Sequence, residues 1–403
     1  MSNETLNLRQ SDYAVPAQAA QWQKRALIAG VIGVIVCIAG AVLSLDQFLR
    51  GYLIAYMFWL GLSLGCLGLL MVQYLSGGFW GLSIRRVLEA SSKCLPLMFV
   101  LFLPILFGSH HLYEWMNDPS LTEHNRWYLH TGGLGGWYAR WIIYFAIWIS
   151  LATVLNKRGD MQDSPLPGGI QPRFQGLSGL GLVLYSLTLS FAAVDWVMSL
   201  DPHWGSTIYG LIFLAGQGLS ALSFCVILLT VLTHYSPYRE IIKPTQFHDI
   251  GKLMMAFVML FAYFSFSQWL IIWAGNLPEE IGWYLNRIRG GWGVVALIII
   301  LFHFALPFAL LLSRERKRAG SRLIGLAVFL MFMRVVDIYW YVVPNFAHER
   351  GHFYLSPWYI LAPLGVGGVW LSLFFYNFRQ RPLLPLYEPQ ISNFLHQGSG
   401  HGH

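Results

Sequence analysis

Four ionisable side chains lie inside stretches that are otherwise apolar enough to sit in lipid. Arg334 and Asp337 belong to "FMRVVDIYWYVVP", residues 332–344, and Asp195 and His303 lie in comparable apolar stretches. Charged groups in a hydrocarbon layer are costly, and they usually face a partner or a water-filled cavity that serves proton or ion transfer. We therefore treat these four residues as candidates for a proton path or for a polar cavity within the membrane.

Arg334 and Asp337 are three residues apart, so on a helix they share one face and each lowers the cost of burying the other. The alternative is a purely structural ion pair that holds helix bundles together. Asp195 has no cation in its own stretch, so desolvation favours its neutral form. This argument makes Asp195 the better proton-exchanging group and Asp337 the better fixed anion.

His303 lies deeper than the two aspartates. It is twelve residues into the apolar stretch that begins at Gly291, which places it roughly 18 Å below the outer membrane surface. Asp195 and Asp337 lie only roughly 7 to 11 Å below the same surface. Pro307 cannot donate the amide hydrogen that the His303 carbonyl would accept, which predicts a kink. Such a kink either admits water or a polar ligand, or only serves packing.

Histidines and carboxylates also cluster between apolar stretches. The segment "GSHHLYEWMNDP", residues 108–119, supplies His110, His111 and Glu114, and His130 follows before the next stretch. Imidazoles beside carboxylates suit proton release near neutral pH. The alternative is a polar loop that docks a partner protein. Neighbouring histidines diverge on a helix, so we expect no zinc site here.

The composition indicates a membrane protein. Of 403 residues, 56% are hydrophobic and 11% are charged, against about 25% charged in an average soluble domain. Runs of about 20 apolar residues suffice to cross a bilayer, and they predict an all-α membrane protein with about ten transmembrane helices in one domain, residues 26–377. Residues 1–25 and 378–403 are predicted to be cytoplasmic terminal segments. The predicted spans are 26–46, 51–75, 90–108, 138–155, 176–199, 207–233, 248–275, 291–312, 322–343 and 356–377.

The orientation follows from the Lys and Arg residues. Nineteen of the 26 fall in segments on the side of the N-terminus and six on the other side, with Arg334 inside a span. The positive-inside rule therefore predicts that both termini are cytoplasmic. The net charge of +7 reflects this topology and attraction to anionic lipid, and it does not indicate a nucleic-acid site.

An internal repeat is predicted from matching signals four spans apart. Gly-Gly-Trp opens the fourth span at 135–137 and the eighth at 290–292, and Val-Asp pairs containing Asp195 and Asp337 lie near the ends of the fifth and ninth spans. An even separation makes the repeats parallel. The predicted four-helix bundles are residues 51–199 and 207–343.

Two further segments carry structural predictions. Gly61, Gly65 and Gly68 indicate close packing between helices without a chemical role. The stretch "FWGLSIRRVLEASSK", residues 79–93, alternates apolar and cationic positions at helical spacing, so we expect it to lie flat on the cytoplasmic face before the chain turns inward.

The sequence predicts no cofactor in this chain. Its cysteines sit singly in apolar runs, so no covalent haem or iron–sulfur cluster is expected. A transmembrane haem needs two facing imidazoles, and only His303 is deep. Any metal centres would belong to other subunits. The four cysteines are Cys37, Cys66, Cys94 and Cys225.

From about residue 22 to 381 the chain resembles the polysulfide-reductase-like (NrfD-like) membrane subunits of bacterial alternative complex III, most closely the shorter of its two large membrane subunits. The resemblance rests on "GYLIAYMFWLGLSLGCLGLLMVQYLSGGFWGLSIRRVLEA", "FGSHHLYEW", "VDWVMSLDPHW" and "RVVDIYWYVVP".

This resemblance implies a subunit of a quinol:electron-acceptor oxidoreductase of the inner membrane. Its partners would be a second NrfD-like subunit and periplasmic subunits that carry haem c and iron–sulfur clusters. It implies a role in proton conduction and, less directly, quinol binding. Two other classes fit the residues alone: a secondary transporter, which also has repeats and intramembrane charges, and a structural anchor for redox subunits.

Overall fold

Ten helical segments in the described part of the chain are long and apolar enough to cross a membrane. The computed structural model describes residues 13–122, 126–165, 172–346, 352–391 and 393–395. The prediction of an all-α, multi-pass membrane protein is confirmed, and each predicted span coincides with one of these segments. The segments are Gln18–Leu43, Leu45–Ser76, Phe79–Phe107, Trp137–Asp163, Gln175–Leu200, Tyr209–Leu232, Pro244–Gly275, Trp292–Leu312, Gly320–Asn345 and Trp358–Phe378.

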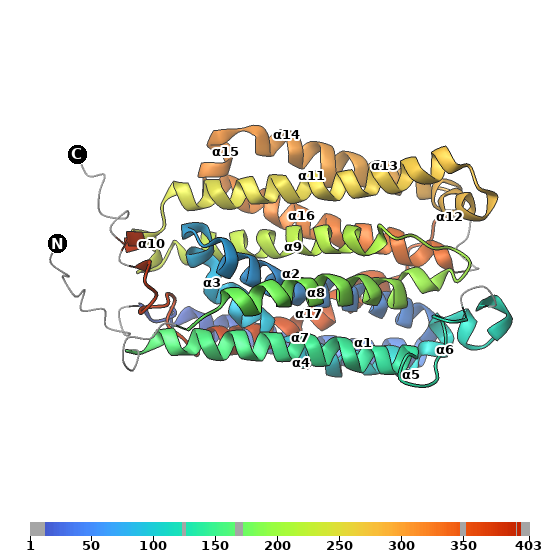
Figure 1. Cartoon of the computed structure of the whole chain (residues 1–403), viewed down its shortest axis with the longest axis horizontal. Coiled ribbons are helices and arrows are strands. Elements are labelled where there is room, and N and C mark those ends of the chain that lie inside the picture. The colour runs from blue at the N-terminus through green and yellow to red at the C-terminus, as the bar shows by residue number, and fades with distance from the viewer. Residues whose placement is uncertain (1–12, 123–125, 166–171, 347–351, 392, 396–403) are drawn as a thin grey trace.

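The long helices run side by side along the long axis of the molecule (Figure 1). Both described ends of the chain lie at one end of the bundle, with α10 and α15; we call this the terminal end, and the end that holds α6 and α12 the opposite end. The helices are α1 (Gln18–Leu43), α2 (Leu45–Ser76), α3 (Phe79–Ser92), α4 (Leu95–Val100), α5 (Leu103–Phe107), α6 (Ser109–Leu112), α7 (Trp137–Asp160), α8 (Gln175–Trp196), α9 (Tyr209–Leu232), α10 (Tyr238–Ile241), α11 (Pro244–Gly275), α12 (Pro278–Ile288), α13 (Trp292–Ile298), α14 (Leu306–Leu312), α15 (Arg314–Arg318), α16 (Gly320–Val342) and α17 (Trp358–Phe378). Short helical turns are η2 (Glu114–Met116), η3 (Pro119–Thr122), η4 (Met161–Asp163), η6 (Met198–Leu200), η7 (Ile299–Ala305) and η8 (Val343–Asn345).

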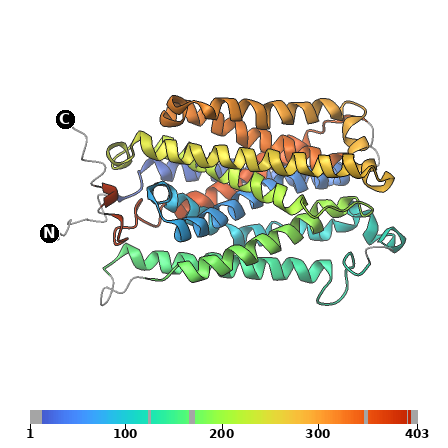
Figure 2. The same ribbon diagram turned by 45° about the horizontal axis from the view of Figure 1, so that its top comes forward.

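Helices α2 and α9 form the centre of the molecule. They pack against each other; α7 and α8 lie on one side of them, and α11 and α13 to α16 lie on the other (Figure 2). Helix α17 packs on α2, and α1 covers α17. Residues on the outer face of α1, such as Val31 and Ile35, are more than half exposed, as expected of a surface that faces acyl chains.

Glycines allow the closest helix contacts, as predicted. A Cβ atom on Gly65 would lie 2.3 Å from the carbonyl oxygen of Gln217 in α9, and one on Gly33 would lie 2.2 Å from the Cα of Gly365 in α17. Backbones approach this closely only where no side chain intervenes, which is how helices gain packing energy in lipid. These glycines therefore fix the spacing of the α2–α9 and α1–α17 pairs.

The prediction that residues 79–93 lie flat on the membrane surface is wrong. Helix α3 is the first part of the third apolar segment, and its residues from Gly81 to Ser92 are buried against α2, α9, α11 and α17. The cationic positions that suggested an interfacial helix make ion pairs inside the protein instead. The spacing of the charges indicated a helix correctly, but it did not reveal what covers the polar face.

We predict that Gly65→Ala destabilises the protein by roughly 1 to 3 kcal/mol, because the new methyl group overlaps a backbone carbonyl that cannot rotate away. Gly325→Ala in α16 is the matched control, because a Cβ there meets nothing within 4 Å. Thermal unfolding of the two variants in one detergent measures the difference. Equal stability would contradict the close-packing assignment.

Candidate functional site

Asp195 is the centre of a buried cluster at the opposite end. It is the penultimate residue of α8, and its carboxylate accepts two hydrogen bonds from Arg140 of α7, from Nε to Oδ2 (2.8 Å) and from Nη2 to Oδ1 (2.7 Å). Tyr144 Oη donates a further hydrogen bond to Oδ2 (2.7 Å). A forked arginine pair of this kind is the strongest form of carboxylate recognition.

Arg140 links this carboxylate to the backbone of the segment that precedes α7. Its Nη1 donates to the carbonyl of Tyr128 (2.9 Å) and to that of Gly135, and the guanidinium lies 4.1 Å from the centre of the Tyr128 ring. Arg140 is 11% exposed whereas Asp195 is 1% exposed. The sequence analysis found no cation for Asp195 because it considered the residue's own span only; the structure shows that Arg140 of the neighbouring helix supplies one.

Asp337 pairs with Arg334, as their spacing predicted. Nη1 of Arg334 donates to Oδ2 of Asp337, and both side chains are at most 3% exposed. The guanidinium lies 5.1 Å from the centre of the Phe213 ring. It also fills the space over Gly216 of α9, where a Cβ atom would lie 2.3 Å from Nη1. The pair therefore sits between α16 and α9, inside the protein and away from lipid.

His303 lies beside this pair in an unusual stretch of helix. Instead of a simple proline kink, residues Ile299–Ala305 form a π-helical turn, η7, which packs against α11 and α16. Such turns occur often at functional sites. The His303 ring contacts Phe261 (4.6 Å between centres), and Arg334 is close enough to act on it electrostatically. Neither ring nitrogen has a hydrogen-bond partner among the described residues, although the side chain is buried.

The predicted loop residues do not converge on one site. His110 Nδ1 contacts Asn117 Oδ1 (3.0 Å), and His111 Nδ1 contacts Asp46 Oδ1 (2.9 Å). Glu114 is exposed at the start of η2, and His130 lies in the segment before α7, where its carbonyl accepts from the Trp137 amide. These side chains therefore lie in separate places at the opposite end and do not form one site.

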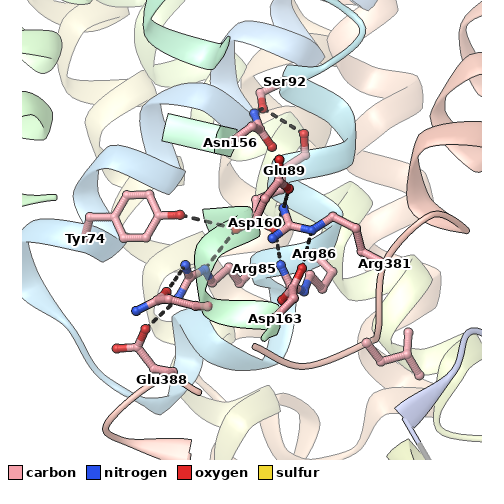
Figure 3. Close-up of polar contacts among 12 residues, drawn as sticks. Tyr74, Arg85, Arg86, Glu89, Ser92, Asn156, Asp160, Asp163, Arg381 and Glu388 are labelled. Atoms are coloured by element: carbon pink, nitrogen blue, oxygen red, sulfur yellow. Dashed lines mark hydrogen bonds and ion pairs between the residues drawn. The ribbon is translucent and has the colours of Figure 1, made fainter. Parts of the chain in front are cut away.

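The largest charged cluster is at the terminal end, and the sequence analysis missed it. Glu89 of α3 is 1% exposed and is shared by three arginines: Arg85 donates to Oε1 (3.0 Å), and Arg86 and Arg381 donate to Oε2 (2.6 and 2.8 Å) (Figure 3). Tyr74 Oη donates to Oε1 (3.2 Å). Three guanidinium groups around one carboxylate hold it ionised. The spacing of Glu89 from Arg85 and Arg86, four and three residues, is the sequence signal from which these two pairs could have been found.

The C-terminal segment closes this cluster. Arg381 also donates to Asp163 of η4 (2.7 Å), and Glu388 accepts from Arg85 (2.9 Å). Burial opposes the charge of Arg381, but the carboxylates of Glu89 and Asp163 outweigh this effect and raise its pKa. Tyr238 of α10 donates to the carbonyl of Leu383 (3.0 Å). The part of the predicted tail that the structure describes is therefore packed against the bundle.

Arg287 of α12 is a second buried cation that the sequence analysis did not single out. It donates to the carbonyls of Trp283 (3.1 Å) and Tyr341 (2.9 Å) and to Asn345 Oδ1 (2.8 Å), and it stacks on the Trp283 ring at 3.4 Å. Burial lowers the pKa of Arg287 to about 9, so the guanidinium stays charged at neutral pH. Carbonyl oxygens and an aromatic face stabilise it, and it ties α12 to η8.

Within the described residues, no group of three or more His, Cys, Asp or Glu side chains is arranged to hold a metal ion. No protein-family model matches the sequence, and no curated protein matches it. Function is therefore inferred from the side chains. Among the described residues, two arginine–aspartate pairs and one buried imidazole with unpaired nitrogens are the groups that we consider for chemistry inside the membrane.

We predict that Asp337→Asn destabilises the protein by roughly 3 to 5 kcal/mol, because it leaves the Arg334 cation buried without a carboxylate. The double variant Arg334→Leu/Asp337→Leu should recover most of this loss, since it removes both charges. Chemical denaturation in detergent measures both. If the double variant is as unstable as the single one, Arg334 and Asp337 also stabilise the protein through contacts other than their mutual ion pair.

We predict that Glu89→Gln also costs roughly 3 to 5 kcal/mol, because three arginines lose their common carboxylate. Asp160→Asn is the control: Asp160 also pairs with Arg381 (3.0 Å), but it is 51% exposed, so its loss should cost at most about 1 kcal/mol. Thermal unfolding of the two variants tests this ranking, and similar losses would contradict it.

Proposed function

We propose that this chain is a membrane subunit of a quinol:electron-acceptor oxidoreductase, as its resemblance to NrfD-like subunits implies. It contributes to proton conduction and to a quinol-adjacent cavity, and its partner subunits carry the haem c and iron–sulfur centres. In this proposal the protein lies in a bacterial inner membrane, with the terminal end cytoplasmic and the opposite end periplasmic. The distribution of Lys and Arg supports this orientation.

The proposal includes the parallel repeat. The first helix of each predicted bundle, α2 and α9, packs against the other at the centre, an arrangement compatible with a pseudo-twofold axis along the membrane normal. Each bundle also has its Val-Asp aspartate paired with an arginine. The source of the arginine differs: Arg140 comes from α7, whereas Arg334 lies on the same helix as Asp337.

The main structural support for the proposal is the buried imidazole of His303. Oxidation of a quinol releases two protons with its two electrons, so a site next to it needs a group that can accept a proton within the membrane. A buried imidazole with both nitrogens unpaired can take up a proton at one nitrogen while it gives up the proton of the other, so it need not stay charged beside Arg334. Leaving it without a partner costs the fold stability. The adjacent Arg334–Asp337 pair gives a fixed anion and cation beside it. At the opposite end, Asp195 is paired with the partly exposed Arg140, so in this proposal protons pass between the protein and the periplasm there.

We predict that His303→Phe in the native complex lowers quinol turnover by about 100-fold or more, the usual contribution of a general acid–base group. Phe fills similar space, so assembly should persist. His234→Gln is the control, because His234 follows α9 at the terminal end and bonds only to nearby backbone carbonyls. Turnover and proton release are measured on complex purified with its cofactor-bearing subunits.

Other outcomes favour the competing classes. Unchanged turnover and proton release in both His303→Phe and Asp195→Asn would remove these residues from a proton path and leave a structural anchor. Solute uptake by the isolated chain in liposomes would indicate a secondary transporter. Purification of the native complex without any haem or iron–sulfur subunit would contradict the assignment to a redox assembly.

A further inference from the structure

A cavity of about 180 Å³ opens at the terminal end, between the α3–α4 junction and α7. Lys93, Asn156, Lys157 and Asp160 line it near the end of α7, and Ile149 lines it further in. Figure 3 shows Asn156 and Asp160 beside the Glu89 cluster. The cavity is separate from the Asp195, Asp337 and His303 sites.

The lining changes from charged to apolar along the membrane normal. Asp160 and Ile149 are eleven residues apart on one helix, or roughly 16 Å. The charged part lies at the level of the helix end, where lipid headgroups lie, and Pro96, Ile149 and Ala152 line the apolar part. This order matches the order of a phospholipid, from its headgroup to its acyl chains.

The charged part has an excess of positive charge. Asp160 is already paired with Arg381 (3.0 Å), and its contact with Lys93 is long (3.8 Å). Lys157 forms no ion pair with any residue that the structure describes. Basic pockets between transmembrane helices bind anionic lipid headgroups. The two lysines therefore suit a phosphodiester.

A buried amide adds a second recognition element. Asn156 is 3% exposed; its Nδ2 donates to Ser92 Oγ (2.9 Å) and to the Ala152 carbonyl (2.8 Å). Its Oδ1 has no donor among the described residues. A hydroxyl group on a lipid headgroup would satisfy this acceptor, whereas a choline headgroup has no hydrogen to donate.

We propose that this cavity binds one anionic glycerophospholipid with a hydroxyl-bearing headgroup, of the phosphatidylglycerol class. Lys93 and Lys157 hold the phosphodiester, Asn156 Oδ1 accepts from the headgroup hydroxyl, and the start of an acyl chain packs on Pro96 and Ile149. This proposal requires membrane insertion only and is independent of the proposed redox role.

Native mass spectrometry of the full-length chain in detergent tests the site, with phosphatidylglycerol, phosphatidylcholine and inorganic phosphate titrated separately. We expect one tightly retained phosphatidylglycerol. Lys93→Gln/Lys157→Gln should weaken its binding by about 30-fold, because each lysine near a lipid phosphate contributes about 1 kcal/mol. Lys243→Gln/Lys252→Gln, at the same end of the molecule but outside the cavity, should bind as the wild type does.

A second pair of variants tests the cavity without changing charge. Thr153 is exposed and lines the cavity, so Thr153→Trp should block the lipid, whereas Val154→Trp on the neighbouring exposed position should not. Retention of phosphatidylglycerol by both Thr153→Trp and the double lysine variant would overturn the proposal. Equal retention of phosphatidylcholine would also overturn it. Equal thermal stabilisation by inorganic phosphate alone would show a free-anion site and not a lipid site.

Discussion

A charge buried in this apolar bundle must be stabilised by a countercharge or by other polar and aromatic groups of the protein, because neither lipid nor bulk water can do so. Arg140 neutralises Asp195, Arg334 neutralises Asp337, and three arginines surround Glu89. The Arg140–Asp195 and Arg381–Glu89 pairs join different segments of the chain, so they also help to select which segments are neighbours. The charged clusters at the two ends of the bundle thus follow from one electrostatic requirement.

The two halves meet this requirement in different ways. In the first, the cation reaches Asp195 from α7 and stays in contact with loop carbonyls, so the pair is joined to the surface. In the second, Arg334 and Asp337 are on one helix, and Gly216 gives the guanidinium room against α9. In the first arrangement, Arg140 links an intramembrane carboxylate to loop carbonyls by hydrogen bonds. In the second, the ion pair is fully buried and makes no such link. In the proposed repeat, the aspartate is thus kept while its contacts differ.

The long helices and the Arg334–Asp337 pair could be predicted from the sequence, because both follow from spacing along one helix. Contacts between helices could not be predicted in this way: the partner of Asp195 is 55 residues away, and Arg381 reaches Glu89 across 292 residues. Residues 79–93 show the limit most clearly. Their amphipathic pattern has the same form whether water, headgroups or other arginines and carboxylates cover the polar face.

The position of Arg381 and Glu388 also bears on biogenesis. Helix α3 enters the membrane early in synthesis with two arginines and one glutamate, whereas the last ligands of that cluster are made after α17. Glu89 can pair with Arg85 and Arg86 as soon as α3 is made, whereas its third arginine and the Glu388 partner of Arg85 follow α17 in the chain. The charged cluster at the terminal end is therefore complete only after the segment that follows α17 has docked on α3.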